Sequence, residues 1–221
     1  MALKPRRSAF AEERASPIAF RQEPVNVVLR KGWPVVQAYE GESNGPHVID
    51  VSHALKLDVQ DEALRKLKPL GLEIPHEPGQ SAVYTDRNLI INRLHGTQAV
   101  IWQLNPDTAI IPEGLQYTDV TDAYLLLVLS GPKIFDIVER LSALDMMDPM
   151  LTCPFVLQGP FAHAPCQVVV VTREATDGII FVACSRGYGQ SFMEALIHAG
   201  EVFDMRPAGE LALNEALAGL R

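Results

Sequence analysis

The chain has 221 residues, of which 48% are hydrophobic and 21% are charged, and its formal net charge at pH 7 is −8. Its length allows a sizeable core, and its acidic balance argues against a protein that binds nucleic acid through a basic stripe. It contains neither the roughly 18 uninterrupted apolar residues of a membrane span nor the apolar segment of a signal peptide, so we expect a cytoplasmic protein.

The cysteines and histidines do not point to a metal centre. Cys153, Cys166 and Cys184 are odd in number and widely spaced, so they predict neither a disulfide framework nor a zinc site. The six histidines have no spacing that is typical of metal ligands. We therefore expect no bound metal and three inert, buried thiols.

The first half of the chain is predicted to be mostly β-strand. Residues 1–24 lack sustained periodicity and are expected to form a flexible arm. Strands are expected over residues 25–29, 35–39, 48–59, 81–85, 89–94 and 98–104. Apolar spacing predicts a helix over residues 61–68, ended by Pro69 and Gly71.

The second half repeats the order of a strand followed by a helix. Its expected strands cover residues 118–129, 168–172 and 179–184, the last two joined around Asp177-Gly178. Its expected helices cover residues 133–144, 190–199 and 210–220, with Gly200 ending the second of them.

A short phrase occurs twice, about 70 residues apart. Asp50-Val51-Ser52-His53-Ala54 in the first half corresponds to Asp119-Val120-Thr121-Asp122-Ala123 in the second. The repeat predicts a duplicated α+β domain over residues 25–221, with pseudo-twofold related halves of about 25–105 and 106–221. A ligand is expected where the halves meet, because pockets favour interfaces between packed units. Asp50 and Asp119 are each expected to cap a turn.

Several short motifs follow one another in a characteristic order: Gly32-Trp33, Asp50-Val51-Ser52-His53, Ser130-Gly131-Pro132-Lys133, Asp177-Gly178 and the stretch 207–217. In this order they resemble the folate-binding region of the glycine cleavage T-protein, or aminomethyltransferase, family. The resemblance implies an α+β fold of the T-protein folate-binding type, without that family's C-terminal barrel domain. It also implies tetrahydrofolate as a cofactor and a place in one-carbon metabolism.

In extent, the chain is similar to the small gamma subunits of heterotetrameric sarcosine oxidases. Leu129-Ser130-Gly131-Pro132, Leu144-Asp145, Ser185-Arg186 and Ser191-Phe192 follow a similar order there. This resemblance implies an accessory subunit whose partners are larger, flavin-containing oxidoreductase subunits.

Three residues are predicted to bind a folate-like ligand. Tyr84 and Asn105 resemble a tyrosine and an asparagine of the T-protein family, which implies a ring packed against a pterin and an amide paired with the pterin edge. Arg173 is a further candidate, since a guanidinium binds carboxylates bidentately. The alternatives are a core tyrosine, a turn asparagine and a surface arginine.

The catalytic carboxylate of the T-protein family has no clear counterpart in this sequence. The family's Gly-Gly-x-x-Asp-Asp loop is missing, and the alignment leaves Asn88 near the catalytic position, with Asp86 as a replacement if the loop is merely shorter. Ile180 and Leu213 stand where the family has a Glu and an Arg. A non-catalytic subunit is therefore the favoured hypothesis, and a tetrahydrofolate-dependent aminomethyltransferase-like enzyme is the alternative.

Overall fold

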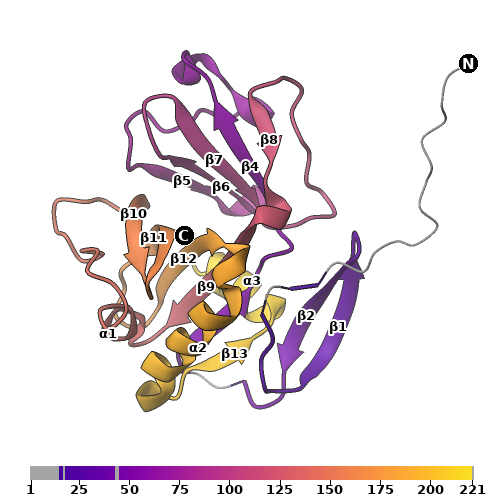
Figure 1. The fold of residues 1–221 in the computed structure, drawn as a ribbon, viewed down its shortest axis with the longest axis vertical. Coiled ribbons are helices and arrows are strands. Elements are labelled where there is room, and N and C mark those ends of the chain that lie inside the picture. The colour runs from indigo at the N-terminus through magenta and orange to yellow at the C-terminus, as the bar shows by residue number, and fades with distance from the viewer. Residues whose placement is uncertain (1–14, 17, 43–44, 221) are drawn as a thin grey trace, which may run out of the picture.

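The computed structural model describes residues 15–16, 18–42 and 45–220, and shows a mixed α+β fold with three sheets and few helices (Figure 1). The first sheet is a hairpin of β1 (Pro24–Arg30) and β2 (Trp33–Tyr39), which confirms the strands expected over residues 25–29 and 35–39. Its turn contains Lys31 and Gly32, both at positive φ, a conformation that suits two-residue hairpin turns.

An antiparallel sheet of five strands has the order β5-β6-β7-β4-β8. Its members are β4 (Leu55–Gln60), β5 (Ser81–Tyr84), β6 (Leu89–Arg93), β7 (Gln98–Gln103) and β8 (Tyr117–Asp119). The predictions of strands over 81–85, 89–94 and 98–104 are confirmed by β5, β6 and β7.

A second, larger sheet has the order β10-β11-β12-β9-β3-β13. Its members are β3 (His47–Asp50), β9 (Tyr124–Gly131), β10 (Phe155–Phe161), β11 (Ala164–Thr172), β12 (Gly178–Ser185) and β13 (Arg206–Ala208). Only the pairing of β13 with β3 is parallel. The predicted β11 and β12 pair is confirmed, whereas β10 and β13 were not predicted.

Each of the two longest predicted strands is in fact two strands in different sheets. Residues 48–59 divide into β3, in the six-stranded sheet, and β4, in the five-stranded sheet. Residues 118–129 divide in the opposite sense, with β8 in the five-stranded sheet and β9 in the six-stranded sheet. The prediction was wrong because the alternation of apolar residues continues through the repeated phrase, which forms a turn in both places.

Helices occur mainly beside the six-stranded sheet. Two predictions are confirmed, by α2 (Gly189–Gly200) and α3 (Glu210–Ala218). The prediction of a helix over 133–144 is too long, because α1 covers only Ile134–Val138. The prediction over 61–68 is wrong, because only a 3₁₀ turn, Leu64–Lys66, forms there. A helix so close to Pro69 has too few residues to offset the cost of its first turn.

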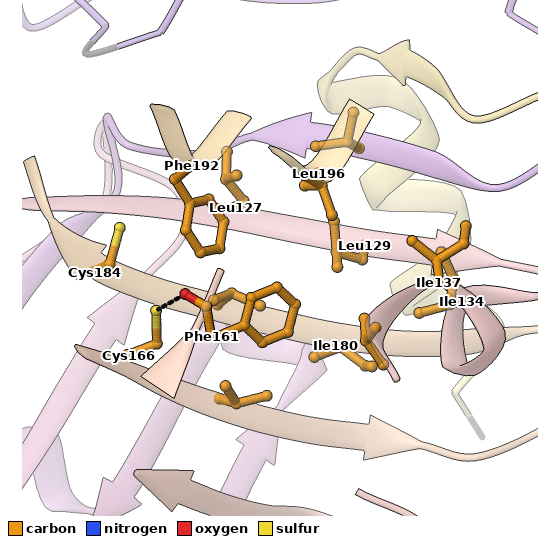
Figure 2. Packing of buried hydrophobic residues seen from close by; sticks show 14 of the residues in the cluster. Leu127, Leu129, Ile134, Ile137, Phe161, Cys166, Ile180, Cys184, Phe192 and Leu196 are labelled. Carbon is orange, nitrogen blue, oxygen red and sulfur yellow. Dashed lines mark hydrogen bonds between the residues drawn. The ribbon is translucent and has the colours of Figure 1, made fainter. Parts of the chain in front are cut away.

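Three apolar clusters define the layers. One fills the space between the two larger sheets, where Trp102 of β7 and Phe181 of β12 lie with ring centroids 6.2 Å apart. A second covers the outer face of the five-stranded sheet. The third joins the six-stranded sheet to α1 and α2, where Figure 2 shows Phe192 and Leu196 of α2 pointing towards Leu127 and Leu129 of β9.

The described part of the N-terminal segment packs against the rest of the chain. Ile18 is buried in the cluster beneath α2, and the Ser16 hydroxyl bonds to the Asp50 carboxylate. The Phe20 ring lies edge-on to Tyr39, with centroids 5.5 Å apart. The part of the predicted arm over residues 1–14 lies outside the described residues.

Candidate functional site

The repeated phrases form two matching turns. Asp50 Oδ1 accepts hydrogen bonds from the backbone N–H and the hydroxyl of Ser52, at 2.9 and 2.6 Å. Asp119 Oδ1 accepts the corresponding bond from the backbone N–H of Thr121, at 2.9 Å. Both carboxylates therefore cap turns, as expected from the sequence, and each turn passes the chain from one sheet to the other.

The two turns also bind each other's following strand. Ser52 Oγ accepts a hydrogen bond from the N–H of Leu126 in β9, at 3.2 Å, and Thr121 Oγ1 accepts one from the N–H of Lys56 in β4, at 3.0 Å. The backbone is bonded in the same sense, from Val51 N–H to the Leu126 carbonyl and from Val120 N–H to the Lys56 carbonyl. The turns thus bind the two sheets together where the halves of the chain cross.

A cavity of about 250 Å³ lies at this crossing. His53 and Leu55 line it from the first turn, and Asp119 and Thr121 line it from the second. Trp33 of the hairpin also lines it, so three motifs that are far apart in the sequence lie around one cavity. The cavity, which we call the crossing cavity, therefore lies where the two copies of the repeated phrase meet.

A buried carboxylate stands behind His53. Glu210, the first residue of α3, accepts a hydrogen bond from Gln37 Nε2 at 2.7 Å and pairs with the Arg30 guanidinium. His53 Nε2 lies 3.7 Å from Glu210 Oε1, too far for a hydrogen bond but within ion-pair distance. Burial alone would raise the pKa of Glu210, but the His53 imidazole, the Gln37 amide and the Arg30 charge together hold that pKa below its ordinary value.

The cavity offers few free polar groups. Thr121 Oγ1 already accepts a hydrogen bond from the N–H of Lys56, and Asp119 Oδ1 accepts one within its turn. Lys31 and His53 are the other ionisable side chains that line the cavity. Its volume is also below the range of about 300 to 1,000 Å³ that is usual for drug-sized ligands. It therefore suits a small ring or fragment better than a complete folate.

Tyr84 lies away from the crossing cavity. Its ring is half-buried against the apolar cluster on the outer face of the five-stranded sheet. Residue pairing runs from Tyr84 to Leu89, Gln103 and finally Leu55, which lines the cavity. Three strand spacings separate the two ends of that row, a distance of about 14 Å.

Asn105 forms a turn beside the crossing cavity. Its Oδ1 accepts a hydrogen bond from the N–H of Asp107 at 3.0 Å, and the next residue, Pro106, lines the cavity. Asp107 in turn lies 3.4 Å from Arg30 of the hairpin. Asn105 thus positions a wall of the cavity while its own amide oxygen is engaged.

Arg173 holds a loop of the six-stranded sheet. Its guanidinium donates to the carbonyls of Asp148, at 2.7 Å, and Leu151, and to Cys153 Sγ at 3.3 Å. The guanidinium also lies 5.1 Å from the centre of the Phe155 ring. The structure therefore does not bring Tyr84, Asn105 and Arg173 together in one pocket.

The positions that align with the family's catalytic and charged residues hold either residues of a short link between two strands or buried apolar side chains. Asn88 has a left-handed backbone and closes the four-residue link between Tyr84 and Leu89, in which Asp86 is exposed. Ile180 is buried beneath α1 and α2, whereas Leu213 packs in the cluster between the sheets. Ile179, not Ile180, shares that cluster with Leu213, and it too is apolar.

Glu210, Arg30 and Gln37 were not predicted from the sequence. Glu210 is 173 positions from Gln37 and 180 from Arg30, and no local pattern connects them. The one available signal was a glutamate directly after Gly209, at a predicted helix start, where a carboxylate is favoured.

No family model and no curated protein matches the sequence. Among solved structures, glycine cleavage system aminomethyltransferase T from Bartonella henselae superposes with a TM-score of 0.61 and 17% identity, over 85% of this chain and 56% of that one. A chain of heterotetrameric sarcosine oxidase from Corynebacterium sp. U-96, solved in complex with pyrrole 2-carboxylate, superposes with a TM-score of 0.55 and 13% identity, over 74% and 87% of the two chains. The chain has a T-protein-like fold. The resemblance inferred from the motifs is therefore confirmed.

The two superpositions differ in extent. The T-protein-like chain spans little more than half of the aminomethyltransferase, but it accounts for most of the sarcosine oxidase chain. At these identities the likeness establishes the fold and not the activity. No group of three or more metal-ligating side chains occurs within residues 15–16, 18–42 and 45–220, and no helix in that part is long and apolar enough to cross a membrane.

Proposed function

We propose that this chain is a non-catalytic accessory subunit of a larger, flavin-containing oxidoreductase in one-carbon metabolism, with a role like that of a sarcosine oxidase gamma subunit. The observation that carries the proposal is the short link between Tyr84 and Leu89, which puts Asn88 in a turn and Asp86 on the exposed surface. A carboxylate must lie within about an ångström of its working position to support transfer chemistry. The apolar Ile179, Ile180 and Leu213 support the same conclusion.

An apolar surface for a partner subunit supports this role. Val25, Val27 and Leu29 are exposed on β1, with exposed fractions of 66%, 46% and 68%. The loop after β7 adds the exposed Ile110 and Ile111, and the ion pair of Arg30 with Asp107 joins this loop to the hairpin. Exposed apolar side chains that gather in this way are typical of protein interfaces.

The experiment is affinity purification of the tagged chain from its source cells, in the cytoplasmic location that we expect. Stoichiometric recovery of larger subunits with flavin absorbance is expected for the wild type and is expected to be lost in a Val27→Asp, Leu29→Asp variant. Val202→Asp is the matched control, because Val202 is an exposed apolar residue near α2. Recovery of a lone chain that binds tetrahydrofolate would contradict the proposal.

The alternative function is a tetrahydrofolate-dependent aminomethyltransferase-like enzyme. The superposition on an aminomethyltransferase over most of this chain favours it. In this case Tyr84, Asn105 and Arg173 would bind folate, which requires them to move from their present separate positions. Calorimetric titration with tetrahydrofolate tests it, since saturable binding that weakens in Asn105→Ala is expected only for this function.

We also propose that the fold is a duplication with halves related by a pseudo-twofold axis. Two observations support it. The strand β3 of the first half lies in the six-stranded sheet, whereas β8 of the second half lies in the five-stranded sheet, and the turns at Asp50 and Asp119 match. Superposing residues 47–105 on residues 117–185 as rigid bodies tests the relationship, which a rotation far from 180° would contradict.

A further inference from the structure

A second cavity, of about 270 Å³, lies between the two larger sheets, next to their shared apolar cluster. Strand alternation places Leu57 and Val59 on the outer face of β4, so Lys56 and Asp58 face the six-stranded sheet. Lys56 lines this inter-sheet cavity, together with Trp102 of β7. The cavity has room for about nine water molecules, or a small organic molecule.

Lys56 is a buried amine with an incomplete set of partners. Its side chain is 1% exposed, and Nζ donates to the carbonyls of Ser52, at 2.7 Å, and Ala54, at 2.9 Å. A lysine ammonium has three N–H donors. Among the described residues, the third donor therefore has no acceptor within hydrogen-bond distance, and no carboxylate lies within ion-pair distance of Nζ.

The charges around Lys56 act from a distance. Burial is the main cause that lowers the pKa of Lys56 to about 7. Asp50, Asp122 and Asp119 in the two turns oppose this change, and Arg186 adds to it. A buried cation without a contacting anion is unfavourable, so an anion placed beside Nζ would stabilise the charged form.

The rest of the cavity suits an anion that carries an apolar body. The Asp58 carboxylate is already engaged by the side-chain amides of Gln60, at 2.6 Å, and Gln98, at 2.8 Å. Trp102, 2% exposed, provides an apolar wall. Tyr124 and Gln167, both half-buried, line the cavity with a hydroxyl and an amide that can donate to a second carboxylate oxygen.

We propose that the inter-sheet cavity is a binding site for a small monocarboxylate, whose carboxylate accepts the free donor of Lys56 and whose apolar body packs against Trp102. The site is separate from the crossing cavity, and it goes beyond the proposed accessory function, because it requires neither a partner subunit nor folate.

The test is calorimetric titration of the full chain with benzoate, with benzyl alcohol as a neutral probe of similar shape. Saturable binding of benzoate and none of benzyl alcohol is expected at pH 6. Binding is expected to be about 30-fold weaker at pH 8.5, from the titration of one group with a pKa of about 7. At pH 8.5 the complex should also take up close to one proton as it forms. Titrations in two buffers of different ionisation enthalpy measure this uptake.

Lys56→Met keeps the unbranched, flexible shape of the side chain up to the ε position and removes the ammonium group, and is expected to weaken benzoate binding at pH 6 by at least about tenfold. Lys66→Met, at an exposed lysine, is the control and is expected to bind like the wild type. If Lys56→Met does not fold, the proton uptake of the wild type still decides the question. No saturable binding, equal binding of benzyl alcohol, or binding without pH dependence would overturn the proposal.

Discussion

Ser52 and Thr121 occupy equivalent positions in the two turns, and the hydroxyl of each accepts a hydrogen bond from the strand that follows the other turn. Both side chains are buried, with exposed fractions of 1% and 4%. Each hydroxyl therefore satisfies a backbone N–H that water does not reach. The repeated phrase is thus explained by structure: it provides the same turn, and the same bond across the crossing, once in each direction.

Replacing Thr121 with Val should destabilise the protein by about 1 to 3 kcal/mol, because the shape is kept but the buried N–H of Lys56 loses its acceptor. Urea denaturation at pH 7 measures the change. Thr121→Ser is the matched control, and it should stay much closer to the wild type because it keeps the hydroxyl. Ser52→Ala should cost a similar amount through Leu126. Equal stability of Thr121→Val and Thr121→Ser would contradict this account.

Glu210→Gln tests the buried polar group behind the crossing cavity. The variant removes the negative charge that faces Arg30 and His53. We expect it to lower the free energy of unfolding by about 2 kcal/mol at pH 7. This is less than the cost of breaking an isolated buried ion pair, because Arg30 still pairs with Asp107. Glu215→Gln, at an exposed position of the same helix, should change stability by less than about 0.5 kcal/mol.

The pH dependence of the Glu210→Gln effect has a defined sign. The folded-state pKa of Glu210 is lowered, so its stabilisation is fully present above the ordinary carboxyl pKa and is lost as the pH falls through the folded value. The difference between wild type and variant should therefore shrink on acidification below about pH 4.5. A difference that stays constant to pH 3 would show that the charge of Glu210 does not contribute.

Much of the fold could be predicted where the signals are local. The turn at Lys31-Gly32 and the helix α2 could be predicted, because both depend on neighbouring residues alone. The division of residues 48–59 between two sheets could not be predicted, since the apolar alternation is continuous and only pairing with β9 and β7 shows where the chain crosses.

The site was less predictable than the fold. The repeat pointed to a cavity between the halves, and His53, Asp119 and Thr121 do meet there. The predicted binding residues Tyr84 and Asn105 came from resemblance and Arg173 from the chemistry of its guanidinium. Neither source fixes the face on which a side chain lies or the partners that it contacts. Glu210 joins His53 only through the packing of α3 against the hairpin, a long-range contact that no sequence window contains.

Arg173→Gln tests whether this arginine holds the loop over residues 148–153. The guanidinium is bonded to two carbonyls of this loop and to Cys153 Sγ, so its loss should leave these groups without donors. We expect faster amide hydrogen exchange in residues 148–153 and a loss of about 1 to 3 kcal/mol. Arg65→Gln, which breaks an exposed ion pair with Glu77, should change neither. Unchanged exchange in Arg173→Gln would contradict this role, and the guanidinium of the wild type would then be available to a ligand.

Lys56 should make the stability of the protein rise with pH. Its pKa is about 7 in the folded chain, against about 10.4 for an unperturbed lysine, so between these values the unfolded state binds more protons and stability increases as the pH rises. Relative to Lys56→Met, the wild type should gain about 2 to 3 kcal/mol of unfolding free energy between pH 6 and pH 9. Urea denaturation of both proteins at the two pH values measures this gain, and Lys66→Met, at an exposed site, provides the reference. A gain near zero would mean that Lys56 keeps an ordinary pKa, and that the carboxylates of the two turns neutralise its charge in the folded protein.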